Sequence, residues 1–359
     1  MRDTAWRAFL VTVIVLGVVV AALALWELRL LLALLFLAFT IAAAMRPSVE
    51  VLRRQGIPRG LGILVHYAAL AGLVTLLLWA VVPRAIDQVR SAVGDVPTSR
   101  AELETATEES SGLKREILQR VQDNLEDLPS SSELIDPAVE FTSIALEVAI
   151  GILFVLASAA YWIFERDRAV SLVTSLLPRS RRQLVRDTWQ LIDLKLGAYV
   201  RGQFLLILLV ATVLSLAFWA IGLPFWLLLG AFAGVVEIVP VIGPLAAGAL
   251  AVGVGFTQSW GVALAAGIVV LVVRLLEDYL VIPRVLGEAV GLSPLVVLVS
   301  VAATAILFGG FAVLLAIPFA AVLATLMDVI VHKVDPAEEE VPTVLFPAKD
   351  AETTTTSRT

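Results

Sequence analysis

Long apolar stretches alternate with short charged segments along the chain. A helix needs about 20 mainly apolar residues to cross roughly 30 Å of hydrocarbon, so runs near that length mark candidate spans. Such runs occupy residues 6–26, 30–45, 61–82 and 141–164, and the chain is almost continuously apolar over 202–331. The pattern predicts a bundle of membrane-spanning helices.

The first two apolar stretches are separated only by Glu27, Leu28 and Arg29. We expect a helical hairpin with a tight turn at this charged pair. A cleaved signal peptide ending near Ala24 is the alternative. It is disfavoured because its apolar core would exceed the usual length of about 7 to 15 residues and because a second apolar run follows immediately.

The distribution of arginine predicts the orientation, since short loops rich in Lys and Arg remain in the cytoplasm. Residues 46–59 hold four arginines and a single acid, Glu50, and residues 165–201 hold eight basic side chains. Placing both segments in the cytoplasm also places both termini there. Residues 83–140, where acids outnumber bases, then lie outside the cell.

Three segments are too polar to cross lipid. Residues 83–140 contain an amphipathic helical stripe that either packs on the protein's own outer surface or forms a contact between protomers: Leu113, Ile117, Val121, Leu125 and Leu128. Within the cytoplasmic connection 165–201, residues 168–201 fit an amphipathic helix at the anionic leaflet. Residues 332–359 are acidic and then rich in threonine, so we expect a disordered cytoplasmic tail.

Composition restricts the class of protein. The chain has 359 residues, of which 59% are hydrophobic and 16% charged, whereas soluble domains carry about 25% charged residues. We therefore predict an all-α integral membrane protein whose transmembrane segments lie in residues 1–82 and, beyond the external segment, in residues 141–331. The net charge of −6 does not favour nucleic-acid binding. Cysteine is absent, only two histidines occur, and no nucleotide-binding or hydrolase motif is found, so we expect no metal and no cofactor.

The last third of the chain departs from simple spans. Residues 224–257 are interrupted by Pro240, Gly243 and Pro244, and helices broken in this way are tolerated in a membrane only where they are buried or line a cavity. Either a re-entrant hairpin or two thin, tilted spans would fit. Residues 294–331 are interrupted by helix-breaking residues in a similar way. This similarity suggests an inverted repeat of two broken-helix hairpins, a feature of transporters.

Ionisable side chains interrupt the same apolar region. A charge at the centre of the bilayer costs at least ~2.5 to 3.5 kcal/mol, so it is usually paired or functional. Arg274 and Asp278 are four residues apart and Glu277 is three from Arg274, which predicts a structural ion pair between Arg274 and Asp278. Glu237 has no base near it in sequence, so a role with a proton or cation is open, as is a helix-capping role.

Six motifs, in this order and spacing, resemble those of the autoinducer-2 exporter-like (PerM-type) membrane proteins of bacteria. They cover residues 199–203, 222–224, 237–244, 277–287, 292–294 and 307–318, and include Tyr199-Val-Arg201-Gly202-Gln203, Glu237-Ile-Val-Pro240-Val-Ile-Gly243-Pro244 and Glu277-Asp-Tyr-Leu-Val-Ile-Pro283-Arg-Val-Leu-Gly287. The likeness extends over residues 5–332.

The resemblance implies a polytopic protein of the bacterial inner membrane, with about eight transmembrane segments, that exports small solutes. Members are connected with autoinducer-2 export or with sodium or lithium exchange for protons. By this resemblance the substrate or ion site comprises Glu237, Pro240, Gly243, Glu277, Pro283 and Gly287. We expect a secondary transporter, not an enzyme, with a small solute, a coupling proton or sodium ion, membrane lipid and a second copy of the chain as partners. A non-transporting scaffold or a passive channel is the alternative.

Overall fold

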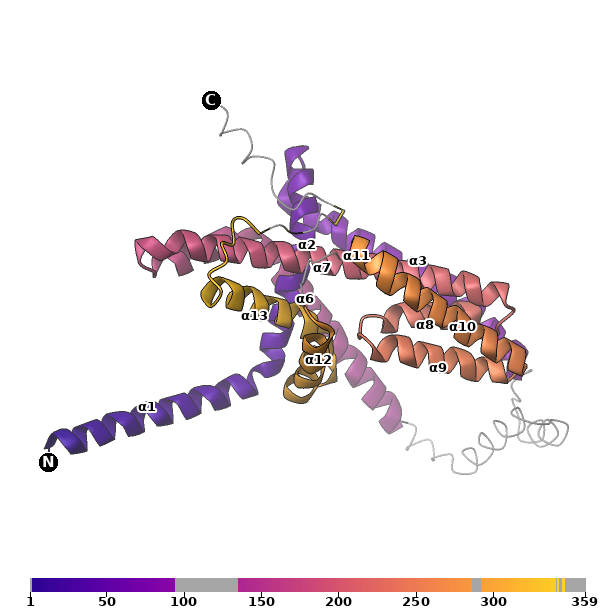
Figure 1. Ribbon diagram of the computed structural model, residues 1–359, viewed down its shortest axis with the longest axis horizontal. Helices are drawn as coiled ribbons and strands as arrows, with labels where there is room; N and C mark the ends of the chain where they lie inside the picture. The colour runs from indigo at the N-terminus through magenta and orange to yellow at the C-terminus, as the bar shows by residue number, and fades with distance from the viewer. Residues whose placement is uncertain (1, 94–134, 286–291, 340, 342–343, 346–359) are drawn as a thin grey trace. The chain divides into compact units, whose positions relative to one another are not determined.

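The computed structural model describes residues 2–93, 135–285, 292–339, 341 and 344–345, and all regular secondary structure in these ranges is helical (Figure 1). Seven of the described helices are long and apolar enough to cross a membrane, and three shorter apolar helices accompany them. The all-α membrane class is therefore confirmed. The predicted stripe between Leu113 and Leu128 lies outside the described residues.

Five long helices lie in the described part of the first two thirds of the chain, and most extend beyond the predicted apolar stretches: α1 (Arg2–Glu27), α2 (Arg29–Arg54), α3 (Arg59–Val93), α6 (Ile135–Ser175) and α7 (Arg179–Ala220). At about 1.5 Å per residue, the 42 residues of α7 exceed the hydrocarbon thickness about twofold. We therefore expect its arginine-rich first half to extend beyond the hydrocarbon. The predicted connection 165–201 is helical apart from the short turn between α6 and α7.

The tight turn predicted between the first two helices is wrong. Only Leu28 separates α1 from α2. Its N–H donates to the Ala24 carbonyl at 3.0 Å and its carbonyl accepts from the Leu32 N–H at 2.9 Å, so helical hydrogen bonding continues through the junction. A helical hairpin needs a loop of about two to five residues. The apolar window of α1 has no buried residue, so lipid is its natural environment.

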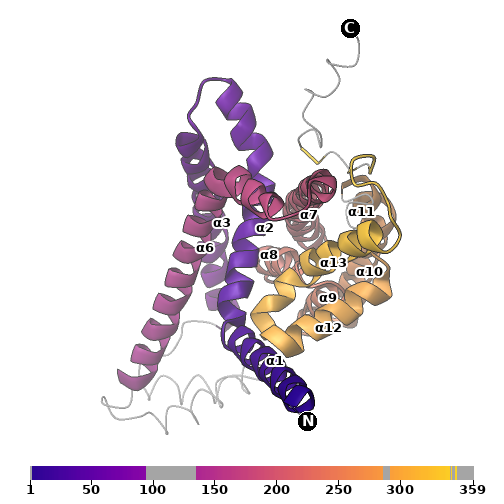
Figure 2. The ribbon, with the colours of Figure 1, turned by 90° about the vertical axis from the view of Figure 1, so that its left-hand side faces the viewer.

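The chain divides into two compact units. The first contains residues 1–44, 151–197 and 292–339. Its last part comprises α12 (Pro294–Phe308), a 3₁₀ turn (Gly310–Leu315) and α13 (Ala316–Ile330), and α12 and α13 lie side by side (Figure 2). The 15 residues of α12 are short for a full crossing, whereas Gly310–Ile330 is long enough to span.

The second unit contains residues 45–150, 198–291 and 340–359. Here α8 (Trp226–Val236), α9 (Ile242–Phe256) and α10 (Trp260–Leu276) lie side by side, followed by a π-helical turn (Glu277–Val281) and α11 (Ile282–Val285) (Figure 1). They enclose a core with α7 that includes Leu206, Val210, Leu214 and Phe218. Because α8 and α9 are only 11 and 15 residues long, their lengths favour the re-entrant hairpin over two full spans. The inverted repeat remains a prediction.

Small residues let α8 approach α7 closely. A Cβ atom on Gly234 would lie 2.6 Å from the Ala211 Cβ and 2.7 Å from the Ile207 carbonyl oxygen, and a Cβ on Gly230 would lie 2.7 Å from the Ser215 Cα. Gly230 and Gly234 form the small-xxx-small pattern typical of helix contacts in membranes. This contact holds the short α8 against the long α7.

We predict that Gly234→Ala destabilises the protein by about 1 to 3 kcal/mol, because the added methyl group forces α8 away from α7. The measurement is the midpoint of thermal unfolding of purified protein in mild detergent. Gly253→Ala in α9 is the matched control, since a Cβ there meets no atom within 4 Å. Equal unfolding midpoints for the two variants would contradict the predicted contact.

The described part of the predicted tail contacts α7. The Lys195 ammonium donates to a Glu339 carboxylate oxygen in the first unit, and in the second unit the Arg201 Nε donates to the Val344 carbonyl at 2.9 Å. Val341 and Val344 are buried. The structure thus gives these residues specific contacts where the sequence predicts disorder, and residues 346–359 lie outside the described ranges.

Candidate functional site

The break between α8 and α9 is formed by Glu237 through Val241. Pro240 cannot donate a helical hydrogen bond. Val241 has φ 67° and ψ −53°, a conformation that β-branched residues rarely adopt. Gly243 allows the chain to turn, because a Cβ there would lie 1.9 Å from the Val236 carbonyl oxygen. Pro240 and Gly243 therefore shape the break, as the sequence predicts for a broken helix.

Glu237 lies at the carboxyl end of α8, and its side chain is 5% exposed. The Nη1 of Arg274, on α10, donates to Glu237 Oε1 at 2.9 Å and to Glu277 Oε2 at 3.2 Å. The Glu277 side chain is 3% exposed, so both carboxylates are buried and share one guanidinium nitrogen. The hairpin thus brings together two acids that are 40 residues apart in sequence.

The same arginine has a third acidic partner. Arg274 Nη2 lies 3.0 Å from Asp278 Oδ1, at the i, i+4 spacing noted in the sequence, and the Asp278 side chain is 42% exposed. The contact between Arg274 and Glu237 could not be read from neighbouring residues, because it depends on how α8 packs against α10. Glu237 therefore has a basic partner after all.

Charge is not balanced within this cluster, which we define as Glu237, Arg274, Glu277 and Asp278. Three carboxylates face one guanidinium. Within the described residues, Glu277 Oε1 is buried and has no hydrogen-bond partner. A buried carboxylate needs a proton, a cation or a hydrogen-bond donor to offset the loss of water. Of the two buried carboxylates, Glu237 and Glu277, one is in excess over Arg274, so the buried part of the cluster can accept one positive charge.

The backbone around the cluster is irregular on both sides. The Gln203 Nε2 on α7 donates to the Glu237 carbonyl at 3.2 Å, a contact that sequence reasoning missed although Gln203 falls in a family-like motif. Glu277 opens the π-helical turn, and single π turns in long helices often mark functional sites. Pro283 follows in α11 and is exposed, outside the cluster, and Gly287 lies outside the described residues.

The space beside the cluster is small. A cavity of about 10 Å³ is lined by Glu237, Arg274 and Glu277 together with apolar side chains of α7, α8, α9 and α10. This volume is close to the minimum that holds one water molecule, about 10 to 15 Å³. A proton, a water molecule or a small desolvated ion fits, whereas an organic solute does not.

Comparisons with known proteins agree with the membrane architecture. The family described as AI-2E family transporter matches residues 11–332. Two proteins of Bacillus subtilis (strain 168) are similar to the chain: "Putative transport protein YrrI", 28% identical over 82% of this chain and 84% of its own length, and "Putative transport protein YueF", 30% identical over 77% and 78%. "Putative permease PerM" of Escherichia coli (strain K12) is 27% identical over 52% of each chain.

Proposed function

The chain belongs to the AI-2E transporter family, and we propose that it is a secondary transporter that exports a small solute or ion in exchange for protons or sodium ions. Its family and its apolar helices make it a multi-pass membrane transporter. The proposal adds the driving ion, the direction and the site. We place the site at the Glu237–Arg274–Glu277–Asp278 cluster beside the α8–α9 break.

One observation carries this proposal: two buried carboxylates share a single arginine next to a broken helix. Broken helices in transporters present carbonyl oxygens and helix ends to substrates or ions near the midplane of the membrane. Burial of charge there is costly, and a scaffold would gain nothing from it. A carboxylate in excess over its basic partner provides the reversible binding of one proton or one cation that coupling requires.

The small size of the cavity indicates that the coupling ion and an organic solute bind at different places. Because about 10 Å³ cannot hold an organic solute, the cluster is suited to the coupling ion. Exchange of the ion with either side then requires α8 and α9 to move relative to α10, and the π turn and the break are the irregular segments where such a movement would begin. A solute that is not itself a small ion would bind elsewhere along the pathway.

The test is reconstitution of the purified protein into liposomes with imposed pH or sodium gradients, while internal pH is read with an entrapped dye. We expect protein-dependent proton movement that requires a second cation or a polar solute on the opposite side. Solute flux that ignores both gradients would identify a passive channel. The absence of any flux across a panel of cations and small polar solutes would favour a scaffold.

The orientation is a further prediction. We propose that both termini and the arginine-rich segments 46–59 and 165–201 are cytoplasmic, in the bacterial inner membrane, and that 83–140 is external. Because the chain has no cysteine, Thr107→Cys introduces a unique thiol. We expect an impermeant thiol reagent to label it in intact cells. Labelling only after lysis would reverse the assignment.

We also propose a homo-oligomer, because α1 exposes apolar side chains around its full circumference and packs on no buried core. Lipid alone could cover such a helix. The mass of the purified protein, corrected for bound detergent, distinguishes the two arrangements: a mass equal to one chain in mild detergent would contradict the oligomer.

A further inference from the structure

The two buried acids of the cluster, Glu237 and Glu277, lie close to each other. Both carboxylates contact the same nitrogen, Arg274 Nη1, at 2.9 Å and 3.2 Å, so the two contacting oxygens can be no farther apart than these distances combined. Two negative charges so close together inside a protein repel each other strongly, and one proton shared by both acids removes this repulsion. The geometry of the buried pair therefore favours one bound positive charge.

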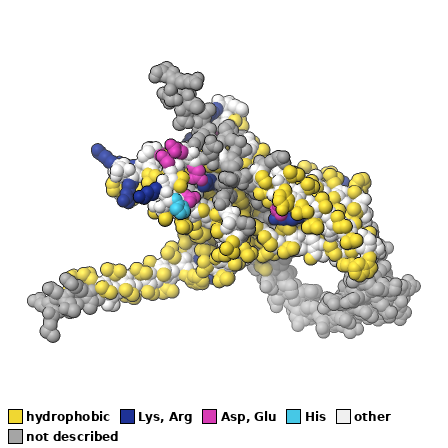
Figure 3. Space-filling view, viewed as in Figure 1, with side chains coloured by type: hydrophobic (Ala, Val, Ile, Leu, Met, Phe, Trp, Pro, Cys, Tyr) yellow, Lys and Arg dark blue, Asp and Glu magenta, His cyan; other side chains and the backbone are white. Residues whose placement is uncertain are grey.

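The third acid of the cluster lies at the surface of the second unit. Asp278 Oδ1 is 3.0 Å from Arg274 Nη2, and the Asp278 side chain is 42% exposed. Figure 3 shows a few charged side chains within the hydrophobic surface near α10 and α11. Arg274 thus contacts the exposed acid with one nitrogen and the buried pair with the other, so the buried pair is a separate site.

One oxygen of the buried pair needs a hydrogen-bond donor. Among the residues that the structure describes, Glu277 Oε1 is buried without a hydrogen-bond partner, and the Glu277 side chain is 3% exposed. Glu277 Oε2 already accepts from Arg274. A carboxylate oxygen without a donor is costly away from water. A bound proton turns one acid of the pair into an O–H donor and so meets this need without any further residue.

The cavity beside the pair supplies too few oxygen atoms for a metal ion. Hard cations in proteins are held by several oxygens from carboxylates, carbonyls and water. Apart from Glu237, Glu277 and Arg274, the described residues that line the cavity are apolar, and its volume of about 10 Å³ holds at most about one water molecule. The guanidinium of Arg274 also repels a second fixed cation. A proton needs only one covalent O–H bond.

The carbonyl groups of the α8–α9 break already accept hydrogen bonds. The Val239 carbonyl accepts from the Gly243 N–H at 2.9 Å, and the Pro240 carbonyl accepts from the Ile242 N–H at 2.7 Å. The Glu237 carbonyl accepts from a side chain of α7 at 3.2 Å. These oxygens stabilise the break itself, and a sodium ion would have to compete with these bonds for its ligands.

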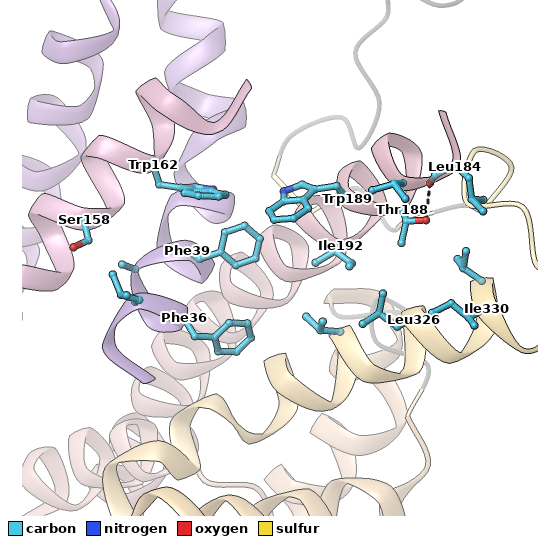
Figure 4. A pocket seen from close by; sticks show the side chains of 15 residues that line it. Phe36, Phe39, Ser158, Trp162, Leu184, Thr188, Trp189, Ile192, Leu326 and Ile330 are labelled. Carbon is cyan, nitrogen blue, oxygen red and sulfur yellow. Dashed lines mark hydrogen bonds between the residues drawn. The ribbon is translucent and has the colours of Figure 1, made fainter. Parts of the chain in front are cut away.

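A larger pocket in the first unit offers no comparable site. This aromatic pocket, about 650 Å³ in volume, lies between α2, α6, α7 and α13, and Figure 4 shows Phe39, Trp162 and Trp189 at one end. The ring of Phe39 meets Trp162 edge to face at 5.3 Å between centroids, and Trp162 stacks on Trp189 at 6.0 Å. None of the described residues that line the pocket is ionisable, so it cannot hold a proton reversibly.

We propose that the coupling ion is a proton, and that Glu237 and Glu277 share it with Arg274 as their fixed counter-charge. The inference rests on the proposed function, because it names the ion of that same site. Binding forms an O–H bond on one acid and leaves the pair with one negative charge, which Arg274 balances. Release to either side of the membrane breaks this bond and restores the excess charge. A transported sodium ion would bind elsewhere along the pathway.

The test is infrared spectroscopy of the full-length protein in lipid bilayers, because a protonated carboxylic acid has a C=O stretching band distinct from those of ionised carboxylates. Exposed carboxyl groups are ionised above about pH 6, so the band then reports buried acids. We expect the wild-type protein to show this band in sodium-free buffer, and the band to shift in D₂O. Saturating sodium at constant pH is expected to leave it unchanged. A missing band, or its loss on addition of sodium, would overturn the proposal.

Two variants test whether the proton is shared. In Glu237→Gln or Glu277→Gln, Arg274 matches the charge of the remaining buried carboxylate, so each single change is expected to remove the whole band. Glu147→Gln, at an exposed position of α6, is the matched control and is expected to leave the band intact. A band that survives one of the two changes at full intensity would assign the proton to the other acid alone and overturn the sharing. The unfolding midpoint of each variant reports its folding.

The infrared band and the liposome assay together distinguish this inference from the proposed function. Gradient-driven flux in a wild-type protein that lacks the band would leave the transporter in place and overturn the proton at this pair. A wild-type protein that shows the sodium-insensitive band, but no flux under any gradient, would support the proton site and contradict secondary transport.

Discussion

Glu237→Gln is expected to abolish gradient-driven flux while the protein still folds and inserts. Glutamine keeps the size of the side chain and can still accept from Arg274 Nη1, which lies 2.9 Å from Glu237 Oε1. The change removes one of the two buried negative charges that share Arg274. Glu277 is then the one buried carboxylate left in the cluster, and Arg274 matches its charge, so the buried part of the cluster loses its capacity to bind a proton or cation.

The measurement is proton-linked flux in liposomes, with expression and the unfolding midpoint as controls for folding. We expect flux at the level of empty liposomes and a loss of stability on the order of 1 kcal/mol or less, because a neutral hydrogen bond replaces a charged one. Glu147→Gln is the matched control, since Glu147 is an exposed carboxylate on α6, outside the cluster. Wild-type flux in Glu237→Gln would remove Glu237 from the coupling mechanism and leave only a capping role at the end of α8.

The membrane class and the position of the break could be predicted from sequence because both depend on local properties. Apolar runs near the length of a span report lipid exposure directly. Pro240 cannot donate a helical hydrogen bond, and Gly243 lets the start of α9 approach the end of α8 closely, so the position of the break follows from residue type. Glu237 and Glu277 could also be identified from local sequence, because charged residues are rare in apolar segments.

The prediction that failed and the contacts that sequence analysis missed depend on packing between segments that are distant in sequence. The hairpin expected at Glu27 and Arg29 was wrong because charged residues do not themselves end a helix, and no glycine or proline stands at that junction. The contact of Arg274 with Glu237 crosses 37 residues and exists only once α8 packs beside α10. The aromatic pocket draws Phe39, Trp162 and Trp189 from three helices, and in each helix alone these residues resemble ordinary lipid-facing side chains.

Arg274→Gln is expected to produce the largest loss of stability, about 3 to 5 kcal/mol, because it leaves buried carboxylates without their cation. Glu237 and Glu277 both depend on this guanidinium, and each side chain is at most 5% exposed. The measurement is the unfolding midpoint in mild detergent and the fraction of protein that remains monodisperse. Arg53→Gln is the matched control: Arg53 pairs with Glu50 at an exposed position, so its loss should cost less than about 1 kcal/mol.

A second substitution distinguishes charge imbalance from simple loss of packing. If unpaired carboxylates cause the damage, adding Glu237→Gln to Arg274→Gln removes one of them and should restore part of the stability, so the two changes are not additive. Glu277→Gln in the same background should act alike, because its carboxylate shares the same nitrogen. Additive losses in both double variants would mean that Arg274 stabilises the hairpin through its hydrocarbon stem rather than its charge. The Glu237–Arg274–Glu277–Asp278 cluster would then lack the electrostatic coupling on which reversible binding of a proton or cation depends.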